Sequence, residues 1–166
     1  MATSQGATKL LVSDLSRIFG SRLLSVMIYG AHAEHAVRHG GGQHGGRGEA
    51  ITCLVLVQSL GAAELDTCAK ASAGWHRAGL ATPLILPDSE FRASLDAFPL
   101  EYGEILRAHV CIYGDEPFAG VSIAPHDLRR ACETHVKSHL VHLREGYLET
   151  EGKPREISEL VHASAT

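Results

Sequence analysis

The chain has 166 residues, of which 45% are hydrophobic and 20% charged, and its 15 Lys and Arg against 19 Asp and Glu give a formal net charge of -4. This length suits one domain with a real hydrophobic core, and the composition excludes wholesale disorder. The charge balance gives no sign of a nucleic-acid partner, and no apolar run approaches the roughly 20 residues that cross a bilayer, so we expect neither nucleic-acid nor membrane binding.

The N-terminal residues and the cysteines indicate a cytoplasmic protein. Residues 1–8 are polar and lack the basic stretch and apolar stretch of a secretory signal. The four cysteines are far apart and form no CxxC pair. We interpret them as reduced, structural thiols in a cytoplasm.

Apolar runs predict the β-strands. Three of them predict strands over 23–29, 50–57 and 82–86. The second is nearly all apolar and rich in β-branched residues, which is typical of a central strand. The segment Phe98–Tyr102 is ambiguous, and we interpret it as a strand. A last apolar run covers 108–113.

Apolar residues that recur every three or four positions predict the helices. The predicted helices cover 8–19, 62–78, 89–95, 125–149 and 157–163. We expect Asp88 to cap the third of these, because an aspartate side chain can accept hydrogen bonds from the free amides of a first turn. Residues 31–39 have weak helical character.

This order of elements predicts an α+β fold, in which a small mixed β-sheet is flanked by helices and followed by C-terminal helices. We expect one domain over residues 1–150. The remaining residues, 151–166, are expected to form a helical tail, which either docks on a neighbouring surface or belongs to a truncated helical extension.

Several phrases of the sequence resemble the polymerase-beta-like nucleotidyltransferase superfamily. In that family one strand ends in Gly-Ser, and a second strand carries Asp-x-Asp. Here the first strand reads LLSVMIYG and ends at Gly30, and the second reads ITCLVLV over 51–57. The phrases SLDAFPLEY (94–102), VCIYGDEPFAG (110–120) and LREGYLE (143–149) resemble one bacterial branch of small nucleotidyltransferase-like proteins. The resemblance covers roughly residues 8–150 and implies a nucleotidyltransferase-like fold.

The same resemblance implies that the catalytic carboxylates are missing. The family's two aspartates fall on Ile51 and Cys53, and a shift of one residue gives Ala50 and Thr52. The third carboxylate, on a later strand, falls on Glu101. Nucleotidyl transfer uses two magnesium ions, which need oxygen ligands that neither an isoleucine nor a soft thiol supplies. We therefore expect no catalytic residue and no cofactor, with Mg²⁺ required only if the metal site has been rebuilt.

The residues that would hold a nucleotide are only partly retained. The family's Gly-Ser reads Gly30-Ala31, so a hydroxyl that helps to hold the triphosphate is missing. We take Gly30, Ala31, Arg47 and Glu101 as the nucleotide-binding candidates.

Two groups of histidines stand out among the 11 in the chain. One group surrounds the glycine-rich loop at 40–48 and consists of His32, His35, His39 and His44. A zinc or nickel site there is one hypothesis. With Glu34 as a nearby carboxylate and no cysteine, we interpret the segment as a solvated loop and expect no metal. The other group, His135, His139 and His142, is interpreted as the solvated flank of an amphipathic helix.

Three functions stay open. The first is a catalytically inactive nucleotidyltransferase-like domain that binds a nucleotide or acts through a partner, and it is the one we expect. The second is an active nucleotidyltransferase whose metal site is rebuilt from Glu34, Glu49, Glu101 and the loop histidines. The third is an oligomeric interaction module, either a homo-oligomer or one that pairs with a helical protein, as the resemblance implies for modules of the toxin–antitoxin type.

Overall fold

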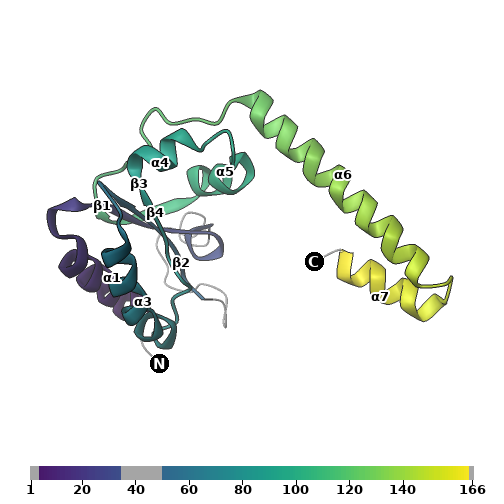
Figure 1. Cartoon of the computed structure of the whole chain (residues 1–166), viewed down its shortest axis with the longest axis horizontal. Coiled ribbons are helices and arrows are strands. Elements are labelled where there is room, and N and C mark those ends of the chain that lie inside the picture. Colours follow the sequence, from purple (N-terminus) through teal and green to yellow (C-terminus); the bar gives the residue numbers. More distant parts are fainter. Residues whose placement is uncertain (1–3, 35–49, 165–166) are drawn as a thin grey trace. The chain divides into compact units, whose positions relative to one another are not determined.

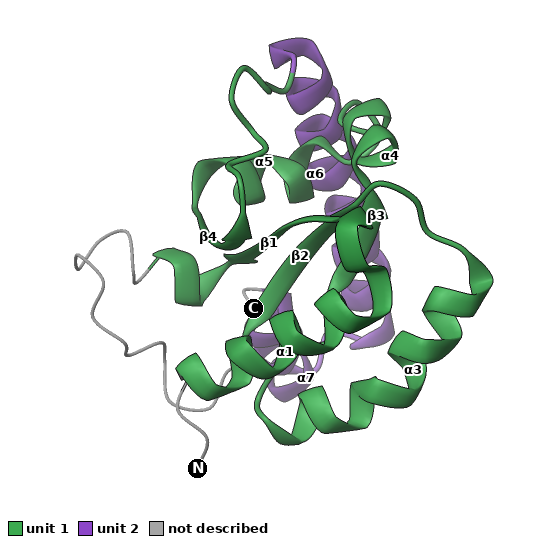
Figure 2. Ribbon diagram, turned by 90° about the vertical axis from the view of Figure 1, so that its left-hand side faces the viewer, with its two compact units in different colours: residues 1–123 green, residues 124–166 purple. Residues whose placement is uncertain are grey.

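A computed structural model describes residues 4–34 and 50–164 (Figure 1). These residues form an α+β structure with a four-stranded mixed sheet that is not closed, flanked by helices and followed by C-terminal helices. The predicted fold class is therefore confirmed. The chain forms two compact units, residues 1–123 and 124–166, coloured separately in Figure 2. The expected division into a domain over 1–150 and a tail over 151–166 stays a prediction.

The sheet has the strand order β3-β2-β1-β4. Its strands are β1 (Leu23–Tyr29), β2 (Thr52–Val57), β3 (Leu84–Pro87) and β4 (His109–Gly114). The strand β1 pairs antiparallel with both β2 and β4, whereas β2 and β3 are parallel. The strand β2 is buried along almost its whole length, as its apolar sequence predicts for a central strand.

The helices α1 (Ser4–Phe19) and α3 (Ala62–Arg77) cover one face of the sheet (Figures 1 and 2). Leu11 and Leu15 of α1 join Trp75 of α3 in one hydrophobic core with the inward side chains of the strands. The indole Nε1 of Trp75 donates a 3.0 Å hydrogen bond to Oδ2 of Asp14, so this buried donor is satisfied and ties α3 to α1.

The helices α4 (Asp88–Ala93) and α5 (Pro99–Arg107) cover the opposite face. Phe91 of α4 is almost completely buried, and its ring lies 4.7 Å from that of Tyr102 on α5 and 5.4 Å from that of Phe118. Such tilted aromatic contacts add to the apolar area that the rings bury. This second core anchors α5 against the sheet.

The interpretation of residues 98–102 as a strand is wrong, because this segment begins the helix α5. Pro99 occupies the start of the helix, where its missing amide hydrogen costs nothing and its fixed φ suits a helical turn. Tyr102 and Ile105, three residues apart, then face the second core. The short apolar phrase therefore follows the helical period rather than the alternation of a strand.

The expected cap at Asp88 is also wrong. Pro87 holds the N-cap position of α4 without a side-chain hydrogen bond, and Asp88 is the first helical residue. Its Oδ2 instead accepts a 2.8 Å hydrogen bond from Nε of Arg92, one turn later. A carboxylate in the first turn still interacts favourably with the helix dipole, which accounts for its position there.

The second unit contains the helices α6 (Pro125–Glu149) and α7 (Pro154–Ser164). The bounds of α6 match the sequence prediction, whereas α7 begins three residues before the predicted start at residue 157. A turn at residues 150–153 joins them, with Gly152 at φ 74° and the Thr150 hydroxyl donating to the Tyr147 carbonyl oxygen at 2.7 Å. In the described ranges no helix has both the length and the apolar character needed to cross a bilayer.

Candidate functional site

The end of the sheet at Gly30 is the place where the resemblance puts the family's site. Tyr29 ends β1 and is paired with Thr52 of β2 on one side and His109 of β4 on the other. The hydroxyl of Thr52 donates a 2.7 Å hydrogen bond to the carbonyl oxygen of Tyr29. We call these four residues, Tyr29, Gly30, Thr52 and His109, the Gly30 end of the sheet.

Gly30 adopts a conformation that side chains oppose. Its φ is +73°, and a Cβ atom there would lie 3.1 Å from Oγ1 of Thr52. Residues 31–34 then form a helical turn, in which the amide of Glu34 donates to the carbonyl oxygen of Gly30 at 3.0 Å. A glycine at this strand end therefore has a conformational reason that does not require a ligand.

An ion pair lies beside this turn. The guanidinium of Arg107, at the end of α5, donates to a carboxylate oxygen of Glu34. This hydrogen bond and the charge of Glu34 raise the pKa of Arg107. The carboxylate of Glu34 is therefore already engaged by a cation of the chain itself.

His109 is held by three contacts that the sequence did not reveal. Its Nδ1 lies 2.9 Å from the carbonyl oxygen of Ile105, and its Nε2 lies 3.0 and 3.1 Å from the two carboxylate oxygens of Glu116. The ring also meets that of Phe118 edge-on, with 4.8 Å between centroids. Both ring nitrogens of His109 therefore face oxygen atoms of the chain. The phrase GDEPF, which begins five residues after His109, is the only sequence signal for this cluster.

The structure places Ile51 and Cys53 inside the core rather than at an open cleft. Ile51 is 5% exposed and Cys53 is 1% exposed, and both belong to the core that α1 and α3 cover. Burial raises the pKa of the Cys53 thiol to about 12. The alternation of a strand then puts Thr52 on the other face, with Leu54 and Leu56.

Glu101 lies on the helix α5, whereas the sequence prediction placed it on a strand. It is exposed in the first turn of α5, six residues before Arg107. This spacing corresponds to about 9 Å along the helix axis. Glu101 and the Glu34–Arg107 pair therefore stand near opposite ends of α5.

Acidic side chains are missing from the sheet itself. None of the residues that form the four described strands is Asp or Glu. Within residues 4–34 and 50–164 there is also no group of three or more His, Cys, Asp and Glu residues placed to hold a metal ion.

Only part of the predicted loop site can be placed. Ala31 is exposed and His32 is half-buried in the turn after Gly30. The remaining candidates lie outside the described residues, namely His35, His39, His44, Arg47 and Glu49.

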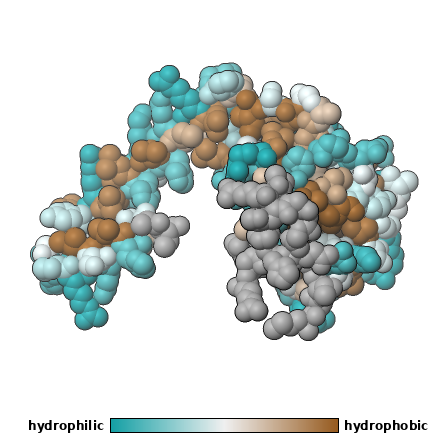
Figure 3. All heavy atoms as spheres, turned by 180° about the vertical axis from the view of Figure 1, so that it is seen from behind, coloured by the Kyte–Doolittle hydropathy of each residue, from teal (hydrophilic) through white to brown (hydrophobic). Residues whose placement is uncertain are grey.

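A second candidate surface lies in the second unit, where apolar residues of α6 recur at intervals of four, three and four. They are Val136, Leu140, Leu143 and Tyr147, and we call them the α6 seam. Val136, Leu140 and Tyr147 are 65%, 43% and 54% exposed. Figure 3 shows hydrophobic residues gathered on the helices α6 and α7.

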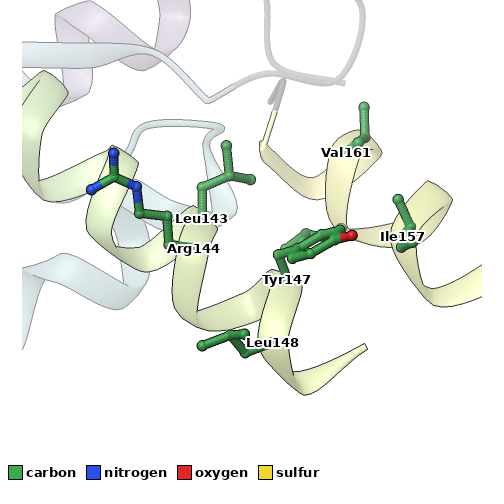
Figure 4. Close-up of a pocket in the computed structure, with 7 residues that line it drawn as sticks. Leu143, Arg144, Tyr147, Leu148, Ile157 and Val161 are labelled. Carbon is green, nitrogen blue, oxygen red and sulfur yellow. The ribbon is translucent and has the colours of Figure 1, made fainter. Parts of the chain in front are cut away.

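At its C-terminal end the seam borders a groove between α6 and α7 (Figure 4). Its volume is about 440 Å³. We call it the α6–α7 groove, and it is lined by Leu143, Arg144, Tyr147, Leu148, Ile157, Leu160 and Val161. The lining is apolar except for the side chain of Arg144.

The second unit has no hydrophobic core of its own among its described residues. Neither of the two cores described above contains a residue beyond 123. Within residues 124–164, only Asp127 and Thr150 are buried. Within the second unit itself, the described apolar side chains are therefore exposed or half-buried.

Comparison with known proteins does not assign the chain to a family. No family model matches the chain, and no curated protein matches it. Among solved structures, the chain is similar to a crystal structure of a mutant toxin-antitoxin MntA-HpeT, with 16% identity and a TM-score of 0.40 over 89% of this chain and 98% of that chain. The fold described above rests on the elements of the chain itself.

Proposed function

We propose that this chain is a nucleotidyltransferase-like domain that does not transfer nucleotides and acts by binding a protein partner through α6 and α7. The observation that carries the proposal is the α6 seam, a row of large apolar side chains exposed on a unit without a core among its described residues. Fully burying a Val or Leu side chain is worth about 1.5–3 kcal/mol, so a partner that covers the seam gains several such contributions. Contiguous exposed apolar surface of this kind is typical of interaction sites.

The four described strands contain no acidic residue, which supports the proposal that the chain does not transfer nucleotides. The strand positions aligned with the family's aspartates hold the buried side chains of Ile51 and Cys53. Of the carboxylates proposed for a rebuilt metal site, two lie in the described part of the chain: Glu34 is paired with Arg107, and Glu101 is about 9 Å along α5 from that arginine. A two-metal clamp requires oxygen ligands that converge, and these acids do not converge with each other.

A nucleotidyl-transfer assay tests this part of the proposal. The chain is incubated with each nucleoside triphosphate and Mg²⁺ or Mn²⁺, and release of pyrophosphate is measured. We expect no release above a sample without protein. Metal-dependent release that is lost in both Glu34→Gln and Glu101→Gln would instead establish the rebuilt metal site. A calorimetric titration of the same nucleotides measures binding separately from turnover.

Two matched variants of α6 test the partner-binding part. Leu140→Glu places a charge in the seam, whereas Val141→Glu places the same charge one residue away, at an exposed position outside it. We expect the chain purified from its native cells to form a complex heavier than the monomer, as measured by light scattering. Leu140→Glu should reduce it to the monomer, and Val141→Glu should leave it intact. A native chain that is monomeric contradicts the proposal.

A further inference from the structure

We propose that the α6 seam and the α6–α7 groove bind an acidic amphipathic helix of another protein. This inference rests on the proposed function, since it names the chemistry of the partner that the seam takes. Three features of the second unit carry it: the length of the apolar surface, the way in which the groove is built, and the charges along one flank.

The dimensions of the surface select a helix over a small molecule. The seam runs from Val136 to Tyr147, eleven residues further along α6, which is about 16 Å of helix. A partner helix that lies along it would present apolar side chains at i, i+3 or i+4, and i+7 over about three turns. The α6–α7 groove, at the end of this row, offers a depression of about 440 Å³ for the largest of them.

Gly146 lies where α7 approaches α6 closely. A Cβ atom at this position would lie 2.7 Å from Cδ1 of Leu160, so a larger residue there would require the Leu160 side chain to shift. The approach brings Ile157 and Val161 of α7 to face Leu143 and Tyr147 of α6 across the groove. The groove is therefore set by local packing inside the second unit.

One flank of the seam carries three cations, of which two are paired with acids of α6. Arg130, Lys137 and Arg144 recur every seven residues, so they lie in a row along one flank of α6. Arg130 pairs with Asp127 at 2.9 Å, and the ammonium of Lys137 lies 3.8 Å from Glu133.

Arg144 differs from the other two cations of this row. It forms no ion pair with any residue in the described part of the chain, and it lines the groove next to Leu143 (Figure 4). A carboxylate on the partner helix, one turn from the apolar side chain that enters the groove, would meet this guanidinium. Arg–carboxylate pairs of this kind can form two parallel hydrogen bonds. These bonds fix the orientation of the partner's carboxylate in addition to selecting its negative charge.

The α6 helix of a second copy does not supply this carboxylate well. Of the acids of α6, Asp127, Glu133 and Glu145 are already paired within the helix. Glu149 lies two residues beyond Tyr147, which is about 200° around the helix and away from the seam. Two α6 seams placed face to face would set apolar residues together but would leave both copies of Arg144 without an unpaired acid of α6.

The test measures binding of three synthetic helical peptides to the full-length chain by fluorescence anisotropy. The peptides have about 20 residues, which is long enough to hold helical structure, and share one leucine seam. Their flanking positions carry Glu, Gln or Lys. We expect the Glu peptide to bind at least tenfold more tightly than the Lys peptide, with the Gln peptide between them.

Charge reversal supplies the matched control. Arg144→Glu should reduce or invert the preference for the Glu peptide. Arg77→Glu, the same change at an exposed position on α3 of the first unit, should leave the preference unchanged. A loss of preference in both variants would assign it to the overall charge of the chain and would overturn the inference.

The remaining outcomes separate this inference from the proposed function. Equal binding of all three peptides, abolished by Leu140→Glu but not by Val141→Glu, overturns the acidic partner and leaves a partner-binding seam. Binding of none of them overturns the acidic helix. Sedimentation of the free chain then tests the proposed function, because a dimer that Leu140→Glu dissociates assigns the seam to a second copy, whereas a monomer overturns both.

Discussion

The hydroxyl of Thr52 donates to the carbonyl oxygen of Tyr29 at 2.7 Å, and the same Oγ1 atom is the nearest obstacle to a side chain on Gly30. One atom on β2 thus contacts the end of β1 and crowds any side chain placed after it. Together with the positive φ of Gly30, this contact opposes a side chain at that position.

Gly30→Ala should destabilise the fold by roughly 1–3 kcal/mol, because the new side chain meets both a positive φ and Oγ1 of Thr52. Gly79→Ala is the matched control, since Gly79 has a φ of +93° but a Cβ atom added there would have no neighbour within 4 Å among the described residues. Urea unfolding of both variants separates backbone strain from the contact. Equal losses in the two variants would show that the contact with Thr52 contributes nothing.

Placing an acid at Cys53, the position that the resemblance aligns with a family aspartate, should destabilise the protein. Cys53→Asp buries a carboxylate beneath α1 and α3, in a core that is built from hydrophobic residues. We expect a loss of about 3 kcal/mol or more in unfolding free energy. Thr52→Asp, on the half-buried neighbouring position, should cost less. The denaturant midpoints of the two variants compare these losses of stability. A Cys53→Asp chain as stable as the native one would contradict the burial of Cys53.

The Cys53 thiol should make stability fall in alkaline solution. Its pKa is raised from 9.0 to about 12 by burial, so between these values the folded chain holds a proton that the unfolded chain releases. The stabilisation is complete below about pH 9 and is lost as pH rises toward 12, at up to about 1.4 kcal/mol for each pH unit. The slope of unfolding free energy against pH between about 9 and 10.5 should be shallower in Cys53→Ala. An identical slope in the two chains would exclude Cys53 as its source.

Phe91→Ala should cost about 3–5 kcal/mol, because the ring is almost completely buried among Tyr102 and Phe118. Phe98→Ala removes the same group from a side chain that is 50% exposed, and it should cost much less. Thermal unfolding compares them directly. Similar losses would mean that residues 98–107 do not pack on the sheet as the helix α5.

The strands of this fold could be predicted because their apolar runs are distinct and largely buried. The segment 98–102 could not, since five residues are too few to separate a helical period from an alternating one, and Pro99 fits either a helix start or a strand edge. Tertiary packing of Tyr102 and Ile105 against Phe91 decides between them.

The candidate site was less predictable than the fold, for a different reason. The direction in which Cys53 and Thr52 face depends on which helices cover each side of the sheet, and no local pattern reports that. The contacts of His109 depend on how residues 115–118 fold back over it. The apolar row of α6, in contrast, follows from the spacing of Val136, Leu140, Leu143 and Tyr147, although its exposure does not.

The parallel edge strand β3 restricts how this protein can meet others. It has four residues, ends at Pro87 and follows directly after Pro83, and neither proline carries an amide hydrogen. A foreign strand that tried to lengthen the sheet here would find a short template with donors missing at both ends. The β3 edge of the sheet therefore discourages strand-by-strand addition of another chain.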